Sequence, residues 1–324
     1  MKEIAFLNRN AEKWERFDAL LNNNAQVNPD ELAKLFIELT DDLSYARTFY
    51  PDSNVARYLN NLALRAHMII YRNRKEKSNR IVNFWKYEFP LIIKQSYRQL
   101  LYAFLIFFIA MLVGVVSSAN DDSFVRLILG DAYVNMTLDN IDKGDPMAVY
   151  KSANNVDMFL GISLNNIWVS FLAFVFGLAF SIGTGYVLVF NGIMLGAFQY
   201  FFYRQGLLYE SLTIWIHGTL EIFSIIVAGA AGMTLGNSIL FPGTYKRIDS
   251  FTRGVKRGLK IVLGLIPMFI IAATFEGFVT RYTQMPNALR LIIIFASLAF
   301  IVWYFFIYPQ IIEKKIMNYG KDRF

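Results

Sequence analysis

Two ionisable side chains, His217 and Glu221, lie in one apolar segment, residues 215–236, that is long enough to cross a bilayer. They are four residues apart, so a helix would place them on one face. Charge is costly in lipid, and this face must therefore turn toward protein, water or a bound partner. An imidazole beside a carboxylate can bind a proton, a cation or a polar substrate.

Other polar side chains are expected at the same depth. If the helix enters from outside near Thr213, a rise of 1.5 Å per residue places His217 about 6 Å deep and Glu221 about 12 Å deep. Glu276, close to the end of the next apolar segment, falls about 6 Å below the same surface. The sequence thus predicts a polar intramembrane cluster in the outer leaflet, comprising Asn165, Asn166, Gln199, His217, Glu221 and Glu276.

Three interpretations of this cluster remain open. The groups could be hydrogen-bonding glue between helices, with each bond contributing about 0.6–2 kcal/mol, and Glu276 could simply reach the interface. They could form a substrate or proton site, which intramembrane carboxylates often mark. A metal is the least favoured, because the other histidine, His67, lies in the N-terminal region and the His217–Glu221 pair supplies two ligands where a catalytic zinc uses three. We expect no metal and no cofactor.

Composition places these residues in an all-α, polytopic helical membrane protein. The chain of 324 residues is 55% hydrophobic and only 18% charged, and it has several apolar segments of membrane-spanning length. It contains no cysteine, which excludes disulfides and thiol chemistry. The net charge of +7 is typical of cytoplasmic loops that meet anionic lipid, so we expect no nucleic-acid partner.

About six transmembrane helices are predicted, near residues 100–118, 162–183, 186–203, 213–235, 260–279 and 289–309. The segment 162–203 would be about 60 Å long as one helix, twice the hydrocarbon thickness, so it must form a hairpin. Its turn is expected at Gly183-Thr184-Gly185, with Asn191-Gly192 as the alternative.

Three domains follow from this division. Residues 1–98 are expected to form a cytoplasmic domain of amphipathic helices, the last of them, over 81–93, lying on the membrane surface. Residues 99–310 form the six-span domain with an acidic extracytoplasmic insertion, 119–160, and residues 311–324 form a basic tail. Basic residues concentrate in 72–98, 236–260 and 310–324, which predicts an inner-membrane protein with both termini in the cytoplasm.

Two further patterns indicate contacts of the spans. Small residues four apart allow close approach of another backbone, either within the chain or in a homodimer, at Asn191, Gly192, Gly196, Ala228, Gly232 and Gly236. A basic stretch leading into the fifth span is expected to face anionic lipid, with a cytoplasmic partner as the alternative: Lys246, Arg247, Arg253, Lys256, Arg257 and Lys260.

Several of these motifs, taken in order, resemble one family. They are Asn165-Asn166-Ile167, Gly183-Thr-Gly185, Asn191-Gly-x-x-Leu-Gly196, His217-Gly-x-x-Glu221 with Ala228-Gly-Ala-Ala-Gly232, and Glu276-Gly-Phe-Val279. Together they are similar to the stage II sporulation protein M family of integral membrane proteins, and Tyr50-Pro-Asp-Ser and Leu59-Asn-x-Leu resemble its longer members. The resemblance implies an anchor for cell-wall-degrading partners, and it implies neither sporulation nor a catalytic mechanism for this chain.

The sequence therefore favours a non-enzymatic membrane scaffold for envelope or cell-wall machinery. Its expected partners are membrane lipids and other membrane or envelope proteins, with a second copy of the chain as an alternative partner. The alternative is a transporter or channel for a small solute or lipid-linked species that uses Glu221 and Glu276. A membrane-embedded hydrolase ranks third, because Gly-x-Ser-x-Gly, His-Glu-x-x-His and paired membrane aspartates are all absent from the sequence.

Overall fold

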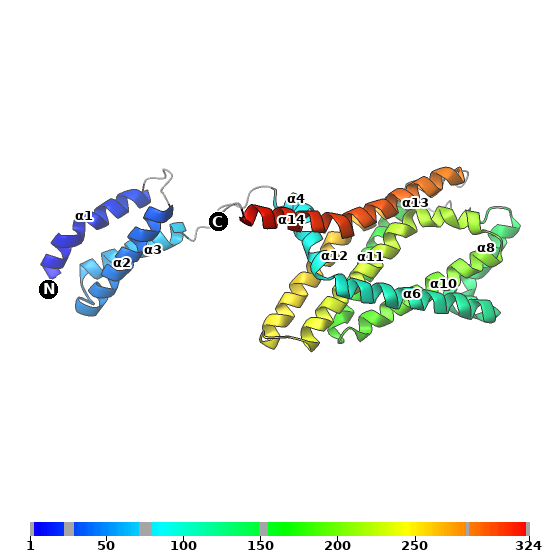
Figure 1. Cartoon of the computed structure of the whole chain (residues 1–324), viewed down its shortest axis with the longest axis horizontal. Coiled ribbons are helices and arrows are strands. Elements are labelled where there is room, and N and C mark those ends of the chain that lie inside the picture. Colours follow the sequence, from blue (N-terminus) through cyan, green and yellow to red (C-terminus); the bar gives the residue numbers. More distant parts are fainter. Residues whose placement is uncertain are drawn as a thin grey trace. The chain divides into compact units, whose positions relative to one another are not determined.

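A computed structural model of the chain is all-α over the residues that it describes, which are 3–22, 29–70, 79–148, 155–280, 282 and 285–321 (Figure 1). Parts of three predicted regions lie outside the described residues: 71–78 of the N-terminal domain, 149–154 of the insertion and 322–324 of the tail. The chain divides into two compact units, Met1–Arg80 and Ile81–Phe324.

The first unit contains three amphipathic helices, α1 (Glu3–Asn22), α2 (Pro29–Phe49) and α3 (Asn54–Ile70). Their apolar stripes meet in a separate core, whose largest fully buried side chains are Phe17, Leu39, Leu59 and Leu62. Burial of such side chains contributes about 1.5–3 kcal/mol each. This unit therefore has the core of an independently folding domain.

The boundary between the units is earlier than the predicted residue 98. The segments α4 (Arg80–Asn83), η1 (Phe84–Glu88) and α5 (Phe89–Gln95) pack in the second unit. Phe89 is 1% exposed and lies against Gly264, where an added Cβ would overlap its ring. Trp85 Nε1 donates to the Gly264 carbonyl at 3.0 Å. The second part of the apolar stripe, with Phe89, Ile92 and Ile93, thus packs against protein, whereas Ile81 and Val82 at its start are exposed.

Six described helices are long and apolar enough to cross a membrane, which confirms the predicted spans: Tyr97–Asn120, Phe159–Leu178, Ile182–Arg204, Leu208–Leu240, Arg247–Val279 and Asn287–Asn318. They correspond to α6, α9 (Asn155–Val175) with η3 (Phe176–Leu178), α10, α11, α12 (Arg247–Thr274) with η4 (Phe275–Val279), and α13 (Asn287–Ile301) with η5 (Val302–Ile307) and α14 (Tyr308–Lys321).

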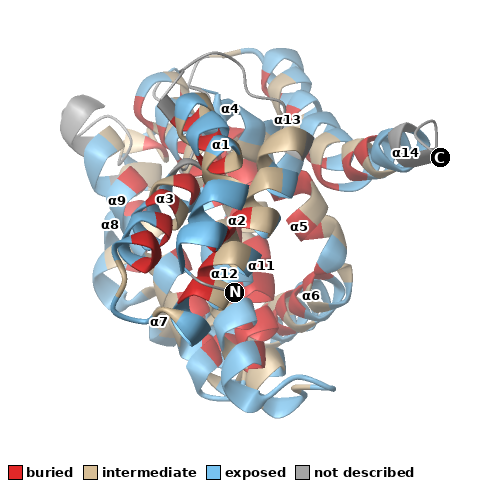
Figure 2. Cartoon of the chain, turned by 90° about the vertical axis from the view of Figure 1, so that its left-hand side faces the viewer, coloured by how far each residue is buried: buried red, intermediate tan, exposed pale blue. Residues whose placement is uncertain are grey.

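Helix α11 (Leu208–Leu240) is central in this bundle. Its most apolar window is 67% buried, against 28% for α6 (Tyr97–Asn120) and 17% for the last span. Figure 2 shows buried residues along α11 and α12. Leu101, Phe108 and Val113 on α6 are exposed, as expected of side chains in lipid. A polar group on α11 is therefore held among other helices.

The hairpin between the second and third spans turns at Ala179–Ser181, ahead of both predicted positions. Phe180 and Ser181 have φ of 52° and 68°, in the left-handed region that seldom suits residues other than glycine. Gly183 lies in the first turn of α10 (Ile182–Arg204), where an added Cβ would lie 2.8 Å from the Phe176 carbonyl oxygen. This glycine allows close packing within the hairpin. Glycine is typical both of turns and of such close contacts, so the sequence alone indicated a turn here.

Small residues let helices touch through their backbones. An added Cβ at Gly232 would overlap the Ala173 carbonyl oxygen and the Thr184 hydroxyl, and one at Gly236 would overlap Ser181. At Gly196 it would overlap the Met111 carbonyl oxygen of α6, and at Gly192 it would lie 2.6 Å from that of Phe107. Both small-residue faces are thus occupied within the chain. Asn191 donates to the Val187 carbonyl of its own helix at 2.8 Å.

Part of the insertion forms two helices, α7 (Asp122–Leu129) and α8 (Asp131–Asp142), on the ends of the spans. Val125, Val134 and Met147 share a core with Phe201 and Phe202 of α10. Asp122 also pairs with Arg204, whose hydrogen bond lowers the pKa of this carboxyl below its ordinary value. The described part of the insertion is therefore seated on α10.

Candidate intramembrane site

Three ionisable side chains converge between α11 and α12. His217 and Glu221 lie one turn apart on α11, and Glu276 lies in η4, the π-helical turn that continues α12. One ligand atom from each of the three side chains lies within 4.8 Å of the others. His217 is 4% exposed, and the side chain of Glu276 is 13% exposed. The predicted cluster of His217, Glu221 and Glu276 is therefore one site in space.

The contacts in this site run between helices. His217 Nε2 lies 3.7 Å from Glu276 Oε2. Asn166 of α9 donates from Nδ2 to Glu221 Oε1 at 2.6 Å. Three of the spans, those formed by α9, α11 and α12, thus contribute side chains, and Glu221 is held by a neighbour that the sequence had placed at its depth.

Thr280, which the sequence analysis did not single out, orients the imidazole. Its hydroxyl lies 3.1 Å from His217 Nδ1 and also donates to the Phe275 carbonyl at 3.1 Å. A hydroxyl has one proton to donate, so it accepts from Nδ1–H of a neutral His217. Nε2 then carries the lone pair on the side that faces Glu276. The sequence feature that could have indicated Thr280 is its four-residue spacing from Glu276, which repeats the spacing of His217 and Glu221.

Two predicted members lie elsewhere. Asn165 is exposed on α9, since its neighbour Asn166 takes the inward face. Gln199 of α10 accepts from Trp215 Nε1 at 3.0 Å and lies 3.4 Å from Ser211 Oγ, to which its amide donates. Depth alone could not distinguish these positions, because it says nothing about the direction in which a side chain leaves its helix.

The predicted basic stretch leads into α12. Arg253 lies over the ring of Tyr245, 3.8 Å from its centroid, and Lys260 pairs with Glu88. Lys246, Arg247, Lys256 and Arg257 are exposed. These positions agree with contact to headgroups, except that Lys260 has a carboxylate of its own chain as a partner.

The carboxylates of Glu221 and Glu276 lie within 4.8 Å of each other, and two negative charges at this distance are costly in a medium of low dielectric constant. Like charges at such a distance repel strongly, and burial adds the cost of removing each from water. The site is stable only if a proton or a cation compensates the negative charge. It can therefore bind either a proton or a cation.

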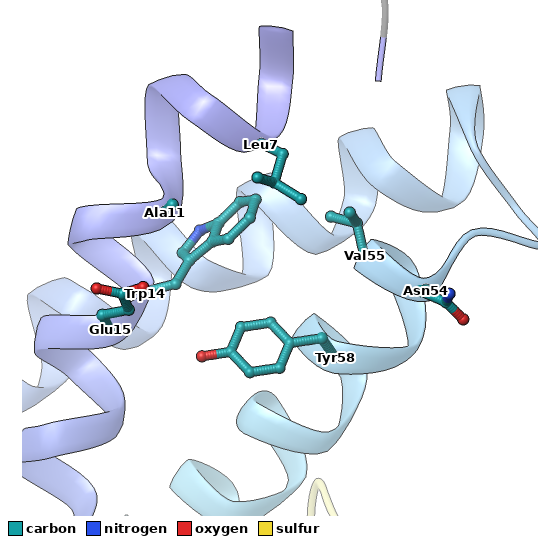
Figure 3. Close-up of a pocket in the computed structure, with 7 residues that line it drawn as sticks. All are labelled: Leu7, Ala11, Trp14, Glu15, Asn54, Val55 and Tyr58. Carbon is teal, nitrogen blue, oxygen red and sulfur yellow. The ribbon is translucent and has the colours of Figure 1, made fainter. Parts of the chain in front are cut away.

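A pocket lies in the first unit, between α1 and α3 (Figure 3). It has a volume of about 260 Å³ and is lined by Leu7, Ala11, Trp14, Glu15, Asn54, Val55 and Tyr58. The rings of Trp14 and Tyr58 lie 6.4 Å apart at an angle of 52°. Its lining is mainly apolar, and Glu15 is the one carboxylate in it. The pocket therefore differs from the intramembrane site, where two carboxylates and an imidazole converge.

Comparison with known proteins gives two family matches. The model described as stage II sporulation protein M matches residues 103–281, more than half of the chain, and this region contains the whole intramembrane site. A domain of unknown function, DUF8413, matches residues 4–72, which correspond to α1–α3. Neither the curated proteins nor the solved structures that were searched contain a match to this chain.

Proposed function

This chain belongs to the stage II sporulation protein M family, and on that premise we propose that it is a non-enzymatic membrane scaffold for envelope or cell-wall machinery. The observation that carries the proposal is a folded, acidic insertion seated on the bundle. Helices α7 and α8 share an apolar core with α10, which gives a partner a fixed surface to bind.

The chemistry of that surface indicates the kind of partner. Asp131, Asp139 and Asp142 of α8 are exposed, while Val134 and Thr137 on the same helix are buried. A carboxylate-rich face attracts a partner with a basic patch and raises the rate of encounter. We therefore propose an envelope protein with a basic surface as the partner. A second copy of the chain remains a further proposed partner.

The proposed orientation puts both termini in the cytoplasm of an inner-membrane protein. Its support is the basic stretch at the start of α12 and the acidic insertion at the other ends of the spans. The absence of cysteine permits a direct test by single substitutions. Lys143→Cys should react with an impermeant maleimide in intact cells, whereas Thr252→Cys should react only after the membrane is opened. The reverse pattern would contradict the orientation.

The scaffold is tested by recovering its partners from native membranes. The triple variant Asp131→Asn, Asp139→Asn, Asp142→Asn should keep normal abundance and lose most of the co-purifying envelope protein. Neutral substitutions are used because added lysines would disturb the charge bias that orients the spans. The matched control neutralises three exposed acids of the first unit, Glu12, Asp41 and Asp52, and should retain the envelope partner. Equal recovery from both triple variants would contradict the proposed surface.

Transport is the second candidate, favoured by the convergence of His217, Glu221 and Glu276 inside the spans. A transporter would use these groups as a cation or proton site. The two functions differ in what Glu221→Gln does. A scaffold loses abundance or partner recovery, whereas a transporter keeps both and loses flux in proteoliposomes. A well-folded Glu221→Gln protein that retains its partners and loses flux would reject the scaffold.

A further inference from the structure

We infer that His217, Glu221 and Glu276 form a binding site for one divalent transition-metal cation, with Zn²⁺ as the best match to the ligands. Along the sequence, only His217 and Glu221 have the spacing of two metal ligands on one helix, which is one ligand short of a three-ligand zinc site. The structure adds Glu276 from another span and brings one atom of each side chain within 4.8 Å of the others. This inference depends on the site geometry alone and is independent of the scaffold role.

The distances are close to those of a coordination shell. Zinc holds nitrogen and oxygen ligands at about 2.0–2.2 Å, so two ligands of a tetrahedral zinc lie about 3.3–3.6 Å apart. His217 Nε2 and Glu276 Oε2, at 3.7 Å, are already close to that separation. The widest separation, within 4.8 Å, closes with a movement of about 1 Å, which rotation of a carboxylate side chain supplies.

Charge favours the same occupant. Two carboxylates carry two negative charges, and a divalent cation neutralises both at once while the imidazole ligand remains neutral. Without a cation, the pair must take up protons or bear the repulsion of like charges in a buried position. Metal coordination is one of the few ways in which proteins keep charged carboxylates buried.

Neighbouring side chains already hold the ligands in place. Thr280 fixes His217 with its proton on Nδ1, which directs the Nε2 lone pair toward the carboxylates. Asn166 donates to Glu221 Oε1 and fixes the orientation of this carboxylate. Such outer partners are a regular feature of metal sites, where they fix the tautomer and orientation of each ligand.

The ligand types select the class of metal. An imidazole suits zinc, iron, copper or nickel, whereas magnesium and calcium prefer all-oxygen shells. Sites for Cu(I) are typically built from sulfur ligands, and this site has none. Three protein ligands also leave a coordination position for water. The π-helical turn that carries Glu276 is a local geometry that often occurs at functional sites.

The test uses the full chain in lipid nanodiscs, stripped with a chelator and then titrated with Zn²⁺. We expect one tightly bound ion per chain by elemental analysis. Glu276→Gln should weaken binding at least tenfold, and Thr280→Val or Asn166→Leu should weaken it about 10–100-fold. Three variants should bind as the wild type does: Asn165→Leu, Gln199→Leu and His67→Ala.

Two results would overturn the inference. One is wild-type protein that holds no stoichiometric Zn²⁺, with the carboxylates then compensated by protons. The other is unchanged affinity in a folded Glu276→Gln protein. If that variant does not fold, the Co²⁺ form of the wild type decides: an intense visible band of four- or five-coordinate nitrogen and oxygen ligation supports the site, and the weak spectrum of hydrated cobalt rejects it. Partner recovery is not used, so failure here leaves the scaffold test intact.

Discussion

In the first part of α11, residues 208–221, the contacts with neighbouring helices include ionisable side chains, whereas in the second part, residues 222–240, they include close backbone contacts at glycines. His217 and Glu221 reach Thr280, Glu276 and Asn166. Gly232 and Gly236 instead let Ala173 and Ser181 approach directly. One helix thus joins the same bundle in two ways.

The difference concerns tolerance and function. Backbone contact leaves no room for a side chain, so the glycines of the second part admit almost no change. Polar contacts between membrane helices contribute about 0.6–2 kcal/mol each, so the first part can lose one of them and still fold. A protein that needs only a rigid frame could use glycine contacts throughout. The first part of α11 is therefore the one in which a function beyond packing is expected.

The largest effect is predicted at Gly232. In Gly232→Ala the new methyl group overlaps the Ala173 carbonyl oxygen and the Thr184 hydroxyl, so the helices must separate. Overpacking of this kind costs about 1–3 kcal/mol. Reversible unfolding in mixed micelles should show this loss in the free energy of unfolding. Gly185→Ala is the matched control, because its methyl group meets no atom within 4 Å, and it should be neutral or stabilising by up to about 1 kcal/mol. Equal losses in both variants would contradict the packing described.

An intermediate effect is predicted at Asn166. Asn166→Leu removes the amide that donates to Glu221, which costs about 1–2 kcal/mol of the free energy of unfolding. Asn165→Leu should cost almost nothing, because Asn165 is exposed. The two adjacent asparagines differ only in the face of α9 that they occupy. A larger loss of unfolding free energy in Asn165→Leu than in Asn166→Leu would show that the inward face of α9 is assigned incorrectly.

The smallest effect is predicted outside the spans, at Asp122. Arg204 lowers the pKa of this carboxyl, so the pair stabilises the folded state above the unfolded pKa of 3.8 and loses that contribution as the pH falls through the lowered folded value. Asp122→Asn should therefore flatten the fall in melting temperature below pH 4 and change little at neutral pH. The effect should also shrink in high salt. An unchanged acid profile in this variant would show that the pair does not couple to folding.

Four of the spans were predictable from the sequence because each is a continuous apolar segment of the right length, and the second and third were predictable because residues 162–203 are too long for one span. The small-residue spacing at Gly232 and Gly236 also predicted close approach, although not which helix would approach. The turn at Ala179–Ser181 was not predictable, since Phe180 and Ser181 adopt left-handed backbone angles without a glycine.

For the site, depth along each span correctly brought Asn166, His217, Glu221 and Glu276 together. It failed for Asn165 and Gln199, because the rotation of one helix relative to another depends on packing. The role of Thr280 depends on the π-helical turn at Phe275–Val279, which widens the helix just before it. Sequence periodicity assumes 3.6 residues per turn, so the four-residue spacing of Glu276 and Thr280 indicates a shared helix face but does not reveal the π-helical turn.

The candidate site requires the imidazole and the carboxylates to act as one unit, and a double-mutant cycle between His217→Leu and Glu276→Gln tests this directly. Unfolding in nanodiscs should show a coupling free energy of about 1 kcal/mol or more between the two substitutions. Gln199→Leu, combined with Glu276→Gln, provides the control pair and should be additive. If the effects of His217→Leu and Glu276→Gln also add within about 0.5 kcal/mol, the two groups do not interact and the convergent site is contradicted.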